Sequence, residues 1–139
     1  MVHEVAPSER STPLARVKGK NTRPELIVRS IVHALGYRFR LHGKDLPGKP
    51  DLVFPARRKV IFVNGCFWHQ HACPTCKLAR MPKSRPEYWK PKLQGNRERD
   101  LRQQTELHHL GWRVLVVWEC ELRDKERLST ILRLFLDAP

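Results

Sequence analysis

The chain has 139 residues, enough for one domain that buries a core without disulfide bonds. Its 27 Lys and Arg residues against 14 Asp and Glu residues give a formal net charge of +13, which repels itself in a compact fold. No apolar run approaches a membrane span and the N-terminus lacks a hydrophobic leader, so we expect a cytoplasmic protein without a membrane partner. A polyanion is the usual partner of such an excess, and basic clusters at 16–20, 56–59 and 90–92 favour a nucleic acid.

The N-terminal region predicts an arm followed by a helix. Residues 1–21 are polar and basic without periodicity, as in an arm that orders on a partner. The helix should begin at Thr22, because Glu25 three residues on completes a capping box and Pro24 is tolerated in a first turn. Gly36 is the expected stop.

The remaining chain predicts a mixed sheet with two further helices. Strands are expected at 37–41, 51–54, 60–63 and 113–120, of which 60–63 should be buried on both faces and 113–120 should be another buried strand. A Pro-rich basic segment without periodicity covers 74–92. A helix should run from a cap at Asn96 to Gly111, and the closing helix has its apolar face at Leu128, Ile131, Leu132 and Phe135. The predicted order is α-β-β-β-α-β-α, an α/β fold in one domain at 22–139.

The stretch NGCFWHQHACPTC, residues 64–76, predicts a metal site. Cys66, His71 and Cys73 offer three ligands from one loop, and zinc accepts sulfur and nitrogen ligands tetrahedrally but needs a fourth. Cys76 forms a local Cys-x2-Cys pair with Cys73, whereas Cys120 would tie the loop to the last strand. Spacing alone does not choose between these two. A site closed by four protein ligands would be structural.

His69 and Asp100 are candidates for proton transfer. In an extended segment, side chains two apart point the same way, so His69 would lie near a metal bound by His71 without binding it. The alternative is a surface histidine. Asp100 shares a helix face with Leu107 and could orient the imidazole, although a first-turn carboxylate also complements the helix dipole.

Asp51 opens a strand directly after the loop sequence PGKP. A carboxylate at this place often holds Mg²⁺ against phosphate oxygens, and the alternative is a turn cap. A proline-aspartate pair followed by a neighbouring buried strand is typical of Mg²⁺-dependent nucleases, which favours the metal.

Six sequence blocks occur in the order found in one enzyme family: KGKNTRPE (18–25), GYRFRLHGKDLPGKPDLVF (36–54), VIFVNGCFWHQHACP (60–74), RPEYW (85–89), GNRERD (95–100) and GWRVLVVWEC (111–120). Together they resemble the very short patch repair (Vsr) DNA mismatch endonucleases over about residues 10 to 125. The resemblance implies a restriction endonuclease-like fold of the PD-(D/E)xK superfamily. It also implies Mg²⁺-dependent nicking of duplex DNA 5′ to the T of a T·G mismatch, which arises when 5-methylcytosine deaminates. A monomer with a functional link to a cytosine methyltransferase is expected.

The resemblance also assigns catalytic residues. Asp51 resembles the Mg²⁺ carboxylate, and the main-chain carbonyl of Val63 would complete the protein ligands. His69 resembles the general base that activates water, with Asp100 as its partner. Glu25 matches an acidic position near the metal, a role that competes with the capping box.

The resemblance assigns the structural zinc and the aromatic residues as well. The zinc ligands would be Cys66, His71, Cys73 and Cys120, leaving Cys76 spare. The residues that wedge into the base stack would be Phe67, Trp68, Trp89 and Leu14. Without the resemblance, core packing is the simpler interpretation of the Phe-Trp pair.

Two positions depart from the family pattern. Asn64 stands where the family commonly has a histidine near the scissile phosphate, and an amide donates a hydrogen bond but carries no charge. Leu14 replaces an arm methionine. Besides the repair endonuclease, two hypotheses therefore stay open: a related strand nickase or restriction-type nuclease with another site preference, and a zinc-stabilised DNA-binding protein whose catalysis has lapsed.

Overall fold

The computed structural model describes residues 22–73 and 75–139. The predicted arm at 1–21, with Leu14, lies outside these residues. The helices and strands are α3 (Arg23–Ala34), β1 (Arg40–Leu41), β2 (Leu52–Phe54), β3 (Lys59–Asn64), α4 (Pro86–His109), β4 (Arg113–Trp118) and α5 (Lys125–Asp137). Short 3-10 turns are η1 (Pro55–Arg57), η2 (Lys77–Ala79) and η3 (Glu119–Arg123). This order confirms the predicted α-β-β-β-α-β-α arrangement.

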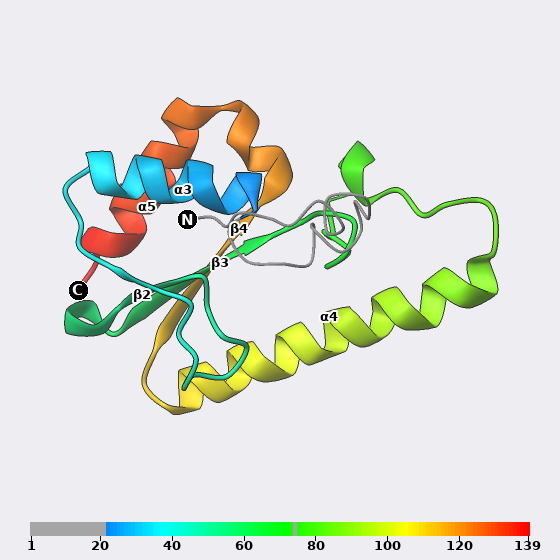
Figure 1. The fold of residues 1–139 in the computed structure, drawn as a ribbon, viewed down its shortest axis with the longest axis horizontal. Helices are drawn as coiled ribbons and strands as arrows, with labels where there is room; N and C mark the ends of the chain where they lie inside the picture. Colours follow the sequence, from blue (N-terminus) through cyan, green and yellow to red (C-terminus); the bar gives the residue numbers. More distant parts are fainter. Residues whose placement is uncertain (1–21, 74) are drawn as a thin grey trace, which may run out of the picture.

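The four strands form one mixed sheet in the order β1-β2-β3-β4. β1, β2 and β3 pair antiparallel, whereas β3 and β4 pair parallel over six residues from Lys59↔Arg113 to Asn64↔Trp118. A parallel pair needs a long crossover, and α4 supplies it. The sheet lies between α3 and α5 on one face and α4 on the other (Figure 1).

Alternation along the central strands builds a core on each face of the sheet. Leu52 and Ile61 face α3 and α5, where they meet buried Val28, Val32, Leu128, Leu132 and Leu136. Val53 and Val60 point the other way and pack with Leu107 of α4 and with Trp112. Val60 and Ile61 of β3 are therefore buried on opposite faces of the sheet, as predicted, while Phe62 and Val63 are half-buried. β4 was also predicted to be buried, but Val117 is its one fully buried residue and most of the strand is half-buried.

The boundaries of β1, α4 and β4 differ from the sequence predictions by two residues or more, and β4 ends at Trp118 rather than at 120. β1 covers only Arg40–Leu41 rather than 37–41, and Tyr37 instead donates a 2.7 Å hydrogen bond to Asp137 at the end of α5. α4 begins at Pro86 rather than at Asn96. Only Leu93 and Leu107 of α4 are buried, so its first turns lack the apolar periodicity from which a helix is predicted.

Within the described chain, none of the helices is long and apolar enough to cross a membrane.

Candidate active site and metal centre

Asp51 lies immediately before β2, beside the end of β3. Its Oδ2 accepts a 2.7 Å hydrogen bond from the backbone amide of Val63. The chain reaches this point through a hairpin loop, in which the His42 amide donates to the Asp51 carbonyl at 3.0 Å and the Gly43 amide to the Pro50 carbonyl at 2.9 Å. Hydrogen bonds from backbone amides of β3 and across the hairpin therefore fix the position of the Asp51 carboxylate.

Glu25 and His42 complete a cluster around Asp51. One ligand atom from each of the three side chains lies within 4.8 Å of the other two. Glu25 is only 2% exposed, and its Oε2 accepts hydrogen bonds from the Arg29 guanidinium and, at 2.7 Å, from His42 Nε2. The two carboxylates at this separation fit a divalent cation site, with the His42 imidazole beside them.

The electrostatics of Asp51 support this assignment. Burial and the neighbouring Glu25 carboxylate raise the pKa of Asp51 to about 7, against the lowering effects of the Val63 amide, His69 and Arg29. The ionised carboxylate is thus disfavoured where it stands. A cation between the two carboxylates would relieve both the burial and the mutual repulsion.

His69 and Asp100 form a pair next to this cluster. His69 Nδ1 and Asp100 Oδ2 are 2.5 Å apart, and the two side chains are 29% and 18% exposed. An ionised carboxylate only accepts hydrogen bonds, so Nδ1 carries the proton and Nε2 of the neutral ring is left as an acceptor. Because His69 acts on the pKa of Asp51, its ring lies within electrostatic reach of that carboxylate. The predicted pairing of His69 with Asp100 therefore exists in the structure.

The loop that carries His69 is a tight turn rather than the extended segment assumed from the sequence. The His69 amide donates to the Gly65 carbonyl at 3.1 Å and the His71 amide to the Cys66 carbonyl at 3.0 Å. Gln70 has a left-handed φ of 48° between the two histidines. The turn separates their roles, because His69 contacts α4 while His71 Nδ1 faces the cysteines.

Four side chains gather behind this turn: Cys66, His71, Cys76 and Cys120. His71 Nδ1 lies 3.4 Å from Cys120 Sγ and 3.8 Å from Cys66 Sγ. Ligands bound tetrahedrally to zinc through sulfur at about 2.3 Å and nitrogen at about 2.0 Å stand roughly 3.5 Å apart, which matches both separations. The His71 ring also stacks on Trp118 with centroids 4.3 Å apart, and this contact fixes its orientation. The cluster fits a structural zinc ion.

The group of side chains that converges differs from the expected zinc set in one member. The resemblance assigns Cys73, but Cys76 stands with the other three ligands and Cys73 is exposed, with its sulfur 3.2 Å from the Thr75 hydroxyl. The reason is a turn in which the Cys76 amide donates to the Cys73 carbonyl at 3.1 Å. This turn directs the second cysteine inward and leaves the first at the surface.

The aromatic residues form a cluster between the turn and the start of α4. Phe67 packs edge-on against Trp68 and Trp89 at centroid distances of 5.1 and 5.3 Å, and the two tryptophans are 6.0 Å apart. All three rings are partly exposed and belong to neither core cluster of the described residues. Asn96 donates a 3.1 Å hydrogen bond to the Trp68 carbonyl, which ties the turn to α4. Core packing, the simpler interpretation of the Phe-Trp pair, is therefore wrong.

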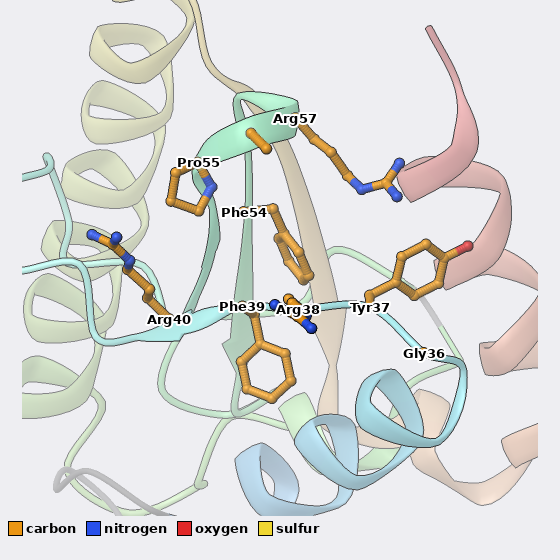
Figure 2. Close-up of a pocket in the computed structure, with 9 residues that line it drawn as sticks. Gly36, Tyr37, Arg38, Phe39, Arg40, Phe54, Pro55 and Arg57 are labelled. Carbon is orange, nitrogen blue, oxygen red and sulfur yellow. The ribbon is translucent and has the colours of Figure 1, made fainter.

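A hollow of about 550 Å³ lies at the end of β2 opposite to Asp51 (Figure 2). Arg40 and Arg57 line it, but their side chains point to opposite sides, and Arg57 donates to the Leu136 carbonyl at 2.9 Å. Its charged groups do not converge on one point. The candidate active site is therefore the Asp51 cluster and not this hollow.

Comparison with known proteins assigns this arrangement to a family. The family described as "DNA mismatch endonuclease Vsr" matches residues 2–75. A protein of Xanthomonas oryzae named "Type II nicking enzyme V.XorIIP" is 53% identical over 137 residues, which cover 99% of this chain and 98% of that protein. The "DNA mismatch endonuclease Vsr" of Escherichia coli is 42% identical over 128 residues, 92% of this chain and 79% of that protein. This chain belongs to the Vsr family.

Membership of the Vsr family makes the chain a DNA endonuclease, a hydrolase of phosphodiester bonds. A solved structure, the catalytic domain of the homing endonuclease I-Bth0305I, matches with a TM-score of 0.55 and 21% identity over 83% of this chain and 94% of that one. At this identity the likeness concerns the fold alone. It confirms the predicted single α/β domain of the restriction endonuclease-like type.

Asn64, the departure from the Vsr pattern, ends β3 next to Val63. It is 6% exposed and stands opposite Trp118 in the parallel ladder. Val63 precedes it, and the Val63 amide already holds Asp51. Asn64 is thus part of the strand end that bounds the Asp51 cluster.

The sequence interpretation missed two residues of the cluster. His42 and Arg29 both contact the Glu25 carboxylate. A signal for His42 existed, because it stands opposite Asp51 across the loop GKDLPGKP when the two flanking strands are paired as a hairpin. Arg29 follows Glu25 by four residues, the spacing of a helical ion pair.

The raised pKa of Asp51 predicts a pH-dependent stability. Its folded pKa of about 7 lies above the ordinary value of 3.8, so protonation favours folding. This stabilising contribution is complete below the ordinary value and is lost as the pH rises through about 7. In Mg²⁺-free buffer we expect Asp51→Asn to exceed the wild type in free energy of unfolding at pH 8. Urea titrations from pH 5 to 8 measure this, with exposed Asp45→Asn as the control; identical pH slopes for wild type and Asp51→Asn would contradict it.

The sulfur cluster predicts which cysteine a bound zinc ion needs. We expect Cys76→Ser to lose the metal and to lower the melting temperature, because it removes one of four converging ligands. Cys73→Ser should keep about one zinc per chain, since Cys73 faces solvent. Elemental analysis of the purified variants decides this, and the assignment fails if Cys73→Ser is the variant that loses zinc.

Proposed function

We propose that this chain nicks duplex DNA 5′ to the T of a T·G mismatch, using Mg²⁺ at Asp51. The observation that carries the proposal is the position of His69. Its ring is paired with Asp100, lies within electrostatic reach of Asp51, and follows the Phe67–Trp68 pair in the same tight turn. A proton acceptor, a cation cluster and exposed aromatic rings thus meet in one place.

The chemistry divides among these side chains. When bound, Mg²⁺ supplies charge neutralisation and polarisation of the phosphate. Asp51 and the Val63 carbonyl would hold it, with Glu25 beside them. His69 takes a proton from the attacking water at Nε2, while its Nδ1 proton stays with Asp100, which orients the ring and stabilises the imidazolium. The water oxygen forms the new bond to phosphorus as the bond to the leaving sugar oxygen breaks, and the leaving oxygen takes a proton from solvent water to become a hydroxyl.

The aromatic cluster supports recognition of a mismatch. Phe67, Trp68 and Trp89 are held together by ring contacts and partly exposed. Inserting a ring between base pairs requires unstacking, which costs a few kcal/mol per step and least at a mismatched pair. Cys66 directly precedes Phe67 and His71 follows Trp68 by three residues, so a zinc ion bound by this cluster would keep the turn rigid during insertion.

The mismatch itself would come from deamination of 5-methylcytosine, so we propose a functional link to a DNA cytosine methyltransferase. We propose a monomer that acts on chromosomal DNA in the bacterial cytoplasm. The excess of positive charge supports backbone contacts in such a complex, because each neutralised phosphate releases counterions.

A second candidate is a related strand nickase or restriction-type nuclease with another site preference. It is favoured by the names of two relatives, the type II nicking enzymes of Xanthomonas oryzae and Neisseria meningitidis. A third, DNA binding without cleavage, has only Asn64 in its favour.

A cleavage assay separates these functions. With Mg²⁺, we expect nicking of the T strand in a T·G duplex and none in the matched duplex. Asp51→Ala should lower the rate by roughly 10³-fold or more, since it removes the cation carboxylate. His69→Ala should lower it by about 10²- to 10⁴-fold through loss of the base. Exposed Asp45→Ala and His109→Ala are the matched controls. Equal cutting of both duplexes would favour the second candidate, and tight binding without any nick would favour the third.

Ring insertion predicts a separate effect on binding. Stacking on an aromatic side chain is worth about 1–3 kcal/mol per base, so Trp68→Ala should weaken binding to the T·G duplex by roughly 5- to 150-fold. Affinity for matched DNA should change little. A 2-aminopurine beside the mismatch reports unstacking as a rise in fluorescence, which the variant should lose. Leu134→Ala, 68% exposed on α5, is the control. An unchanged fluorescence response in Trp68→Ala would exclude insertion of this ring.

A further inference from the structure

His42 stands opposite Asp51 by the register of the first hairpin. The pairs Arg40↔Val53 and Leu41↔Leu52 lead to His42 and Asp51 as the next pair. The 3.0 Å hydrogen bond from the His42 amide to the Asp51 carbonyl continues this register. Directly opposed residues of an antiparallel pair have their side chains on the same face of the sheet. The hairpin therefore fixes an imidazole beside the Asp51 carboxylate.

The backbone of His42 is held in an unfavourable conformation. Its φ is 51°, in the left-handed region that side chains other than glycine rarely adopt. A histidine in this conformation carries an energetic cost, and such backbone outliers are enriched at functional sites.

The imidazole links this hairpin to α3. His42 Nε2 lies 2.7 Å from Glu25 Oε2, and the carboxylate is buried. The Arg29 guanidinium donates to the same oxygen, and His42 Nε2 is 3.3 Å from that guanidinium. A guanidinium cannot accept a hydrogen bond, and an ionised carboxylate cannot donate one. The contact with Glu25 is therefore a hydrogen bond in which the Nε2–H group of His42 donates to the Glu25 carboxylate.

We propose that His42 is a positioning residue of the cation centre. By donating to Glu25, its imidazole holds that carboxylate within reach of Asp51, so that both face one divalent cation. The role rests on the proposed Mg²⁺ site at Asp51 but not on the mismatch as substrate. It needs no transfer of the His42 proton. Glutamine, whose amide nitrogen can donate at a similar reach, should replace it, whereas a side chain without a donor should not.

The test measures cation binding without DNA. Mn²⁺ serves as the probe, because its electron paramagnetic resonance signal distinguishes free from bound ion, and the zinc-loaded full chain is used. Asp51→Ala defines binding elsewhere on the chain. We expect His42→Leu to weaken Mn²⁺ binding by about tenfold and His42→Gln to stay within about threefold of the wild type. His33→Leu, at an exposed histidine in the last turn of α3, is the matched control.

Two further variants separate positioning from a merely structural role. His42→Gly suits the positive φ, so it should melt no lower than the wild type and still lose Mn²⁺ affinity as His42→Leu does. In a Glu25→Gln background, His42→Leu should change Mn²⁺ affinity less than twofold, because the carboxylate that His42 positions is already gone. In nicking assays over a range of DNA concentrations, His42→Leu should lower kcat with little change in KM.

Three results would overturn the proposal. The first is wild-type Mn²⁺ affinity in both His42→Leu and His42→Gly. The second is a loss in His42→Gln as large as in His42→Leu, which would make the imidazole itself a ligand. The third is full additivity with Glu25→Gln. A chain that binds Mn²⁺ in the expected pattern yet fails to nick T·G DNA would support His42 while contradicting the proposed substrate.

Discussion

The hydrogen bond from the Val63 amide to the Asp51 carboxylate connects the fold to the chemistry. It joins the start of β2 to the end of β3 and fixes a carboxylate whose pKa is raised by burial. An unfavourably ionised carboxylate persists only where the surrounding structure holds it rigidly. The two central strands provide this rigidity, because both faces of the sheet are packed. A divalent cation bound here would meet a carboxylate whose position is already fixed by the Val63 amide.

The second constraint is the tight turn at 65–71. Its internal hydrogen bonds present successive side chains to different partners: Cys66 and His71 face the sulfur cluster, Phe67 packs with the tryptophans, and His69 reaches α4. Four side chains of this seven-residue turn thus join three different groups of contacts, because the backbone turns sharply between them. A zinc ion bound behind the turn would fix the conformation of the loop, and through it the positions of His69 and of the aromatic rings.

α4 shows how a polar helix can be positioned without a broad apolar face. Leu107 fixes its C-terminal half against the sheet, while Asp100 and Asn96 bind the turn through hydrogen bonds. The polar contacts that hold the helix are also the contacts of the candidate active site. Because the first turns of α4 have few buried apolar side chains, apolar periodicity did not predict the helix start at Pro86. The position of Asp100 on the same helix face as Leu107, by contrast, did indicate that its side chain could pair with His69.

Sequence alone determined the order of elements, the mixed sheet and the roles of Asp51, His69 and Asp100 as candidates, because strand alternation and motif spacing are local properties. The tertiary structure decided what depends on turns and on pairs distant in the chain. It brought Cys76 to the sulfur cluster and left Cys73 exposed, an outcome that depends on the path of the chain after His71 rather than on the spacing of the cysteines. It also placed His42 and Glu25 together from two different elements. Spacing along the chain cannot foresee such contacts, because they arise only when a helix packs on a hairpin.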